Sequence, residues 1–507
     1  MYGSGMEMPK VSFAAIDFSQ IAAGSYFIGF DLDSAGALSK MDSTGTVTLV
    51  EGAGGGGVID VDSGNGSTYR IDNSNTASGD YSTVSGGYGN TSSGYGSIVS
   101  GGYGNNAGAA GDLNFVGGGY CNTASGYYAT STGGAFNEAS LDYSTVSGGY
   151  NNAAANIGST VSGGYGNSAT GLGSTIGGGL SNSANIEYAT VGGGSSNTAS
   201  GCYSTVGGGY SNTASAYCST VSGGYSNTAS NYYSTVSGGY GNTASSYSST
   251  ANGGKYNTAS GEYSTVSGGY NNYASGICST VSGGSSNTAS NSYSTVGGGY
   301  GNAASGGCST VSGGYCNIAS CNYSTVGGGC SNTASGLYST VSGGYDNSAN
   351  GSCSTVSGGY GNYASNDAST VSGGYINSAS YDYSTVSGGC SNTASGAYST
   401  VGGGRANTAS CNYSTVGGGC FNTASGRCSI VGGGYQNTAS GFYSGILGGI
   451  GNDTNLLSYS FIVGTGITAD TICTTFVNNL SIKNIPTSSA GLCSGMLWSD
   501  SGKICIV

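Results

Sequence analysis

Polar and apolar residues alternate in short runs between residues 75 and 452, and the whole pattern repeats every 15 residues. An Asn begins each repeat, and the consensus reads N-T-A-S-G-x-Y-S-T-V-S-G-G-Y-x, in which we number the Asn as position 0. This Asn occurs 26 times and bounds 25 complete repeats, one of which carries a two-residue insertion. The two runs N-T-A-S and Y-S-T-V-S, separated by glycines, predict two short β-strands per repeat.

The apolar positions predict which side chains face a core. Position 2 is Ala in every repeat except for Ser92, and position 9 is Val or Ile except for Ser131 and Ala251. Strand alternation places these residues inward and the flanking Thr and Ser outward. Because self-similarity at a fixed period is typical of stacked repeats, we predict an all-β fold: a parallel β-solenoid, or β-roll, of about 25 coils.

Glycine and asparagine mark the corners of each predicted coil. Positions 11 and 12 are Gly in all 25 repeats, which indicates a positive φ or a close approach of two backbones. Stacked Asn side chains can form an amide ladder. Burying one Val contributes ~1.5–3 kcal/mol, whereas ordering each backbone residue costs ~1–2 kcal/mol. We therefore expect stabilisation from neighbouring coils and neighbouring chains.

The repeat divides the chain into three predicted regions: an N-terminal β-meander and attachment region (1–70), the solenoid shaft (71–452) and a C-terminal β cap or tip (453–507). A solenoid needs caps because its terminal coils expose strand edges. The meander is predicted from strands within 22–50. Further strands are expected at 458–464 and 475–485, and a terminal hairpin at 496–507.

Composition narrows the possible functions. The net charge of −13 disfavours binding to nucleic acid or anionic lipid, and the absence of an apolar run of about 18 residues predicts no membrane insertion. The chain has no His, so Ser-His-Asp catalysis and His-bearing metal sites are impossible. The carboxylates of the repeats, including Glu138 and Asp142, look scattered rather than paired for glycoside cleavage. We predict no catalytic residue, cofactor or metal, and hence no enzyme.

Sixteen cysteines are distributed so that no two consecutive repeats carry Cys at the same position. Simple ladder disulfides between stacked coils are therefore unavailable, and Cys316 with Cys330 is the best candidate pair. We expect mostly reduced, packed thiols, as in a protein assembled inside a cell.

Two aromatic columns are candidate contact surfaces. Position 6 holds mainly Tyr or Cys and never a charge, which predicts a partly buried subunit interface: Tyr263, Cys278, Tyr293, Cys308 and Tyr323. Position 13 is mostly Tyr but accepts Lys255 and Arg405, which predicts an exposed surface-contact column: Tyr88, Tyr150, Tyr300 and Tyr435. The alternative is that both columns are simply stacked residues that favour β-structure.

The repeat, exemplified by Asn227-Thr-Ala-Ser230 and Ser234-Thr-Val-Ser-Gly-Gly239, resembles the head repeats of trimeric autotransporter adhesins over about three quarters of the chain. The usual repeat of that family is one residue shorter. The resemblance implies a left-handed β-roll and a homotrimer. From these residues we expect none of the signal peptide, heptad stalk and C-terminal membrane barrel that are typical of that family.

The ends resemble another family. Tyr26-Phe-Ile-Gly-Phe-Asp-Leu-Asp33 and Ile485-Pro-Thr-Ser-Ser-Ala-Gly-Leu492 are similar to end segments of bacteriophage tail-fibre-like virion proteins. Together the resemblances imply a structural virion fibre of the phage tail-fibre type, bound to other virion proteins at one end and to a host receptor or glycan elsewhere. Such a fibre would lie on the virion surface, extracellular after assembly in the host cytoplasm.

Two other functions fit the repeat. A secreted self-assembling filament or adhesin would use the same solenoid and polymerise end to end. An ice-binding protein would use the outward Thr column, for example Thr265, Thr280 and Thr295, to order water. The Tyr and Cys columns and the great length favour the fibre over ice binding.

Overall fold

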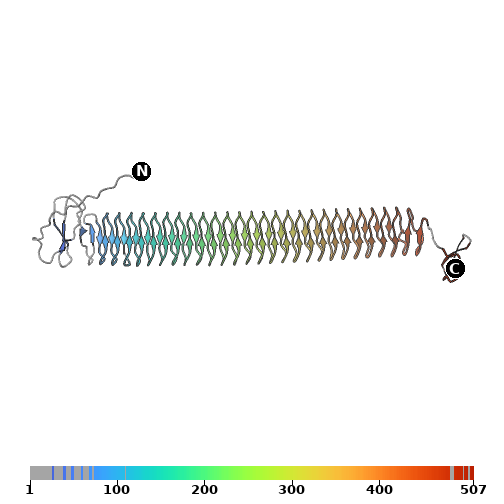
Figure 1. Cartoon of the computed structure of the whole chain (residues 1–507), viewed down its shortest axis with the longest axis horizontal. Helices are drawn as coiled ribbons and strands as arrows, with labels where there is room; N and C mark the ends of the chain where they lie inside the picture. The colour runs from blue at the N-terminus through green and yellow to red at the C-terminus, as the bar shows by residue number, and fades with distance from the viewer. Residues whose placement is uncertain are drawn as a thin grey trace, which may run out of the picture. The chain divides into compact units, whose positions relative to one another are not determined.

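The computed structural model describes five short strands before residue 71 and then residues 74–108, 110–479, 485–494, 496–500 and 503–506. Contacts divide the chain into two compact units, Met1–Gly241 and Asn242–Val507. Every regular element in the described residues is a β-strand. Within each unit, nearly identical coils follow one another (Figure 1).

In the first unit, each coil contributes two strands of two residues. The first strands form the even-numbered series from β6 (Thr76–Ala77) to β26 (Thr228–Ala229), and the second strands form the odd-numbered series from β7 (Thr83–Val84) to β27 (Thr235–Val236). Each strand pairs in parallel with the equivalent strand of the next coil, as in β6 with β8 (Thr91–Ser92). The two series thus make two parallel sheets.

The second unit repeats this arrangement from β28 (Thr243–Ala244) to β54 (Thr438–Ala439) and from β29 (Thr250–Ala251) to β55 (Gly445–Ile446). The predicted parallel β-solenoid with two strands per coil is confirmed. The ladder also continues in parallel from β55 to β56 (Phe461–Val463) and β57 (Thr475–Val477). It therefore passes residue 452, where the sequence placed the end of the shaft.

The predicted N-terminal meander is present as three antiparallel strands, β1 (Tyr26–Phe27), β2 (Leu38–Met41) and β3 (Val47–Val50), in that order. Next along the chain, β4 (Ile59–Asp60) pairs antiparallel with β5 (Thr68–Arg70), which pairs in parallel with β7. The predicted terminal hairpin is also confirmed.

That hairpin consists of β58 (Leu497–Asp500) and β59 (Lys503–Ile506), which pair antiparallel. The strand predicted at 475–485 begins as β57, which ends at Val477; residues 480–484 of that prediction lie outside the described residues.

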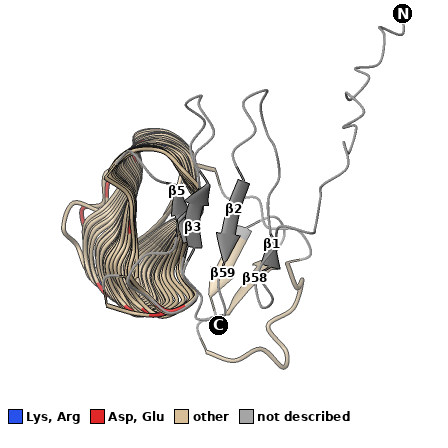
Figure 2. Ribbon diagram, turned by 90° about the vertical axis from the view of Figure 1, so that its left-hand side faces the viewer, with Lys and Arg blue, Asp and Glu red and all other residues tan. Residues whose placement is uncertain are grey.

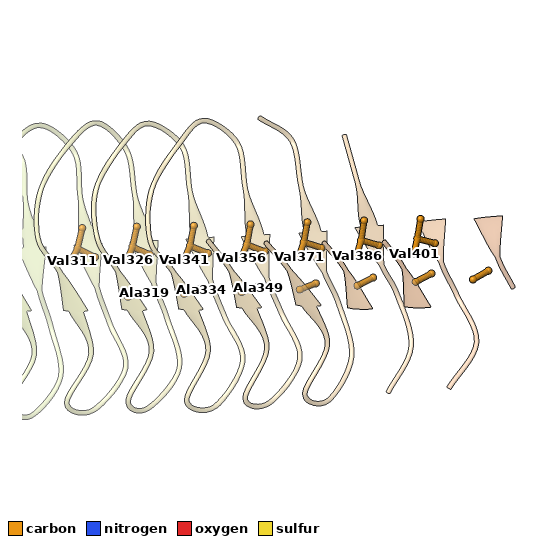
Figure 3. Close-up of a cluster of buried hydrophobic side chains, with 14 of the residues drawn as sticks. Val311, Ala319, Val326, Ala334, Val341, Ala349, Val356, Val371, Val386 and Val401 are labelled. Atoms are coloured by element: carbon orange, nitrogen blue, oxygen red, sulfur yellow. The ribbon is translucent and has the colours of Figure 1, made fainter. Parts of the chain in front are cut away.

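The core is the row of Ala at position 2 and Val at position 9, as predicted. Figure 3 shows this row in the second unit, where Val311 and Val326 project from one sheet and Ala319 and Ala334 from the other; all four are fully buried. The Thr and Ser that directly flank the inward Val, such as Thr310 and Ser312, are half-buried or exposed, as predicted. Ser309, at position 7, and its equivalents are also fully buried. Position 7 lies two residues before the inward Val, so strand alternation places both side chains on the same face.

The predicted amide ladder is confirmed and joins each coil to both neighbours. The backbone N–H of Asn302 donates to Oδ1 of Asn287 at 2.9 Å, one coil earlier. Its Nδ2 donates to the carbonyl oxygens of Gly298 at 2.8 Å and Gly314 at 2.9 Å. The side chain is almost completely buried, so these bonds satisfy both donors where no water can reach them.

Candidate binding surfaces

Position 13 forms an exposed aromatic edge on one corner of the coil. The four predicted surface-contact residues are 42–50% exposed: Tyr88, Tyr150, Tyr300 and Tyr435. Neighbouring residues of the column form isolated parallel bridges, as between Tyr300 and Tyr315. Their rings stack with centroids 5.2 Å apart and an interplanar angle of 11°. Ring faces are therefore covered by neighbours, while ring edges and hydroxyls face outward.

The hydroxyls of this edge are hydrogen-bond donors. The Cys316 thiol next to Tyr315 raises the pKa of that phenol above its ordinary value. A phenol at its ordinary pKa is already protonated at neutral pH, and this shift acts in the same direction. A protonated Tyr can both donate and accept a hydrogen bond.

Position 6 lies on the opposite corner, and the structure does not bury it within the chain. Tyr263, Tyr293 and Tyr323 are 49–61% exposed; Cys308 is exposed, and Cys278 is intermediate. All five predicted interface residues have a positive φ, between 53° and 59°. A left-handed residue at a tight corner directs its side chain away from the coil, so position 6 is exposed within one chain. Its burial at an interface between subunits stays a prediction.

Position 6 also contains ring stacks. Tyr383, Tyr398 and Tyr413 form a run with centroids 4.8 Å and 5.0 Å apart and interplanar angles of 1°. A left-handed Tyr costs of order 1 kcal/mol or more, and aromatic pairs contribute about 0.5–1.5 kcal/mol beyond burial. Stacking of this kind can offset the strain of the corner.

Acidic residues are sparse along the ribbon and appear at its edges (Figure 2). Asp142, at position 5, accepts the backbone N–H of Tyr127 in the preceding coil at 2.9 Å, and Asp367 accepts that of Ser352 at 3.2 Å. Glu138 instead accepts a bond from Ser140 at 2.8 Å. Position 5 carboxylates thus recur in one column, where they cap amides of the neighbouring coil.

The sixteen cysteines include the predicted pair Cys316 and Cys330, and both of these thiols are free and of intermediate exposure. The candidate disulfide is therefore not formed. Within the described residues, no group of His, Cys, Asp or Glu is arranged to hold a metal ion. In the same part of the chain, no helix has the length and hydropathy of a membrane span.

The outward position 8 of the second strand is a further column, which the sequence suggested as an ice-binding ladder. Thr265, Thr280 and Thr295 pair directly with one another in successive coils. Each is half-buried beside a buried Val. The result is a flat row of small hydroxyl-bearing side chains on one sheet.

Comparison with known proteins gives one short match. The family model described as the ubiquitous surface protein adhesin repeat matches residues 264–276. This segment contains β31 (Thr265–Val266) and β32 (Tyr273–Ala274), one strand from each sheet. No curated protein sequence is significantly similar to the chain.

Proposed function

We propose that this chain is a structural fibre of a virion, of the phage tail-fibre type, which adheres to a host or particle surface through its position-13 tyrosine edge. The adhesin-repeat match and the β-solenoid fold fit a repetitive surface adhesion fibre. Partners under this proposal are further copies of the chain, other virion proteins at one end, and a cell-surface receptor or glycan.

The exposed tyrosine edge is the observation that carries the proposal. Tyrosine supplies a large, rigid, amphipathic contact at low entropic cost, and it is enriched in binding surfaces for that reason. Tyr345, Tyr360 and Tyr375 stack with both centroid distances at 5.1 Å. A row of equivalent groups, one per coil, also allows many weak contacts to act together.

Two matched triple variants test this edge. Replacing Tyr345, Tyr360 and Tyr375 with Ser removes three stacked rings at position 13, where Ser285 is a natural precedent. The control replaces the position-6 stack of Tyr383, Tyr398 and Tyr413, where Ser248 is the precedent. We expect the first set to weaken binding to immobilised cell-surface oligosaccharides and to intact cells at least tenfold, and the control to bind like the wild type. Equal binding by both sets would contradict the proposed edge.

The virion assignment has its own test. Mass spectrometry of purified particles from the source of this chain should detect it as a stoichiometric component. Its absence from the particles, together with long regular filaments formed by the purified chain in electron micrographs, would favour the second candidate, a secreted filament or adhesin.

A further inference from the structure

The outward positions of the two sheets differ sharply in how much variation they accept. In the second unit, position 8 is Thr in twelve successive repeats, from Thr250 to Thr415. Position 1 of the same repeats lies on the other sheet, and there six of the twelve residues are not Thr: Tyr273, Ala303, Ile318, Ser348, Tyr363 and Ser378. When the repeats of this chain are compared with one another, the outward residue at position 8 is constant and the outward residue at position 1 varies.

Forces within one chain do not explain this difference. Thr288 at position 1 and Thr295 at position 8 both lie in a two-residue strand, and both are half-buried. β-propensity favours Thr equally at the two sites. The hydroxyls of Thr280, Thr295 and Thr310 donate and accept no hydrogen bond within the described part of the chain.

The exceptions at position 8 show what this face tolerates. Three of them are Ile98, Phe115 and Ile430, apolar residues that are 36–52% exposed, whereas position 1 admits the charged Glu138. A surface that faces water has no reason to exclude charge. A surface that meets another protein does, because interface cores are depleted of charged residues.

We infer that the position-8 face, rather than the Tyr and Cys column at position 6, is where further copies of this chain pack in register; this rests on the proposed fibre function. A partner that needs the same residue in every coil must itself repeat with the coil spacing of ~4.8 Å, and another copy of this solenoid has that spacing. The small residues Thr and Ser or Gly at positions 8 and 10 permit close approach of two sheets.

The available area is adequate for such an interface. Twelve coils at ~4.8 Å and a sheet face ~10 Å wide offer on the order of 600 Å² in the second unit alone. Specific interfaces bury about 600–1,000 Å² per partner, so the face of the second unit alone reaches the lower end of that range; the first unit carries its own equivalent column, Thr130 to Thr235. The core of a single chain holds only one Ala and one Val per coil. Packing against a second copy would bury additional surface and stabilise the solenoid.

Three triple variants of the full chain separate the candidate faces, with the mass in solution measured by size exclusion and light scattering. The first replaces Thr280, Thr295 and Thr310 with Arg at position 8. The matched control replaces Thr258, Thr288 and Thr333 with Arg at position 1 of the other sheet. The third replaces Tyr263, Tyr293 and Tyr323 with Arg at position 6.

We expect the wild type, the position-1 set and the position-6 set to form the same multimer, and the position-8 set to have the mass of one chain, 49.0 kDa. Circular dichroism should show β-structure in all four proteins. If the arginine set does not fold, replacing the same three threonines with Ala should raise the dissociation constant at least tenfold.

Several outcomes would overturn the inference. These are a position-8 set that keeps the wild-type mass, disassembly by the position-6 set instead, an unchanged dissociation constant for the Ala set, or a monomeric wild type. If the wild type is a monomer that inhibits ice recrystallisation, the position-8 face binds ice and not a second copy of the chain. None of these results affects binding by the tyrosine edge, so the adhesion proposal is tested separately.

Discussion

At the residue scale, the two neighbouring glycines at positions 11 and 12 differ in whether the fold has room for a side chain. Gly434, at position 12, has a φ of +92°, and a Cβ there would overlap the carbonyl oxygen of Gly449 in the next coil. A Cβ on Gly433, at position 11, meets no atom within 4 Å. Both positions are invariant in the sequence, but stacking forbids a side chain only at position 12.

Replacing Gly434 with Ala should therefore destabilise its coil by about 1–3 kcal/mol, through overlap and backbone strain. The adjacent Gly433→Ala variant should be close to neutral. Hydrogen–deuterium exchange of peptides from residues 425–455 measures the effect locally, which suits a repeat protein whose coils need not unfold together. Faster exchange in the Gly433→Ala variant than in the Gly434→Ala variant would contradict this explanation.

The Asn ladder predicts a pH-dependent variant. In Asn302→Asp, a carboxylate would face the carbonyl oxygens of Gly298 and Gly314 in place of the amide donor, leaving buried acceptors unpaired at about 1–3 kcal/mol each. Burial and these carbonyls raise the folded pKa of the new carboxyl above its unfolded value, so protonation favours the folded state. Stability should be lowest at neutral pH and recover as the pH falls through the folded pKa.

Thermal unfolding of the wild type and of Asn302→Asp between neutral and acidic pH checks this expectation. The wild type supplies the control, because its amide does not titrate. A variant whose deficit stays constant over that range would show that the lost donor alone, and not the charge, sets the cost.

At the element scale, each strand contributes one inward residue, so the core consists of matched pairs. Ala334 in β40 (Thr333–Ala334) and Val341 in β41 (Thr340–Val341) are both fully buried. Position 2 holds Ala with Ser92 as its one exception, whereas position 9 holds Val or Ile except for the smaller Ser131 and Ala251. One small and one larger side chain therefore meet in most coils, as a closely packed core allows.

Ala334→Val should overpack the coil and cost about 1–3 kcal/mol, and Val341→Ala should leave a cavity. The double variant conserves volume, and we expect it to recover part of the loss, with a coupling energy of about 0.5–3 kcal/mol. Chemical denaturation of all four proteins gives the cycle. Strictly additive losses would mean that the two side chains do not share one packing space.

Most of the elements could be predicted because alternation within a run decides which side chains face inward, as it does for Ala319 and Val326. The corners could not. The left-handed φ of Tyr293 depends on how the chain turns between strands, and no short-range pattern encodes that turn. The last coils escaped prediction since they lose the consensus but keep apolar interior residues such as Ile462 and Ala469.

The candidate binding surfaces could likewise be predicted only in part from the sequence. The exposure of position 13 followed from its tolerance of Lys255 and Arg405. The predicted subunit interface at position 6 rests on the absence of charge, and this criterion alone does not distinguish an exposed corner from an interface. The constancy of position 8 beside the variability of position 1 was present in the sequence, but it becomes informative once both columns are known to be equally exposed.

At the scale of the whole molecule, the two-residue insertion shows which parts of a coil are free to change length. Its strands β10 (Asn106–Ala107) and β11 (Phe115–Val116) keep their parallel register with the next coil. The added residues lie in the corner between them. There Asn114 replaces the usual Ser, donates to the carbonyl oxygen of Gly111 at 2.7 Å and accepts from Ala129 at 3.1 Å. The ladders therefore constrain the strands, whereas this corner can accommodate extra chain.

Two engineered insertions should reproduce this difference. A Gly-Ser pair placed after Gly276, at the equivalent corner, leaves β32 and β33 (Thr280–Val281) in register and should preserve amide protection in the surrounding coils. The same pair placed between Thr280 and Val281 separates two residues that must pair together with Thr265–Val266 and Thr295–Val296. Because each coil contacts mainly its neighbours, hydrogen exchange should show lost protection over the adjacent coils and normal protection in more distant ones. Equal protection in both variants, or loss along the entire chain, would refute a solenoid held together coil by coil.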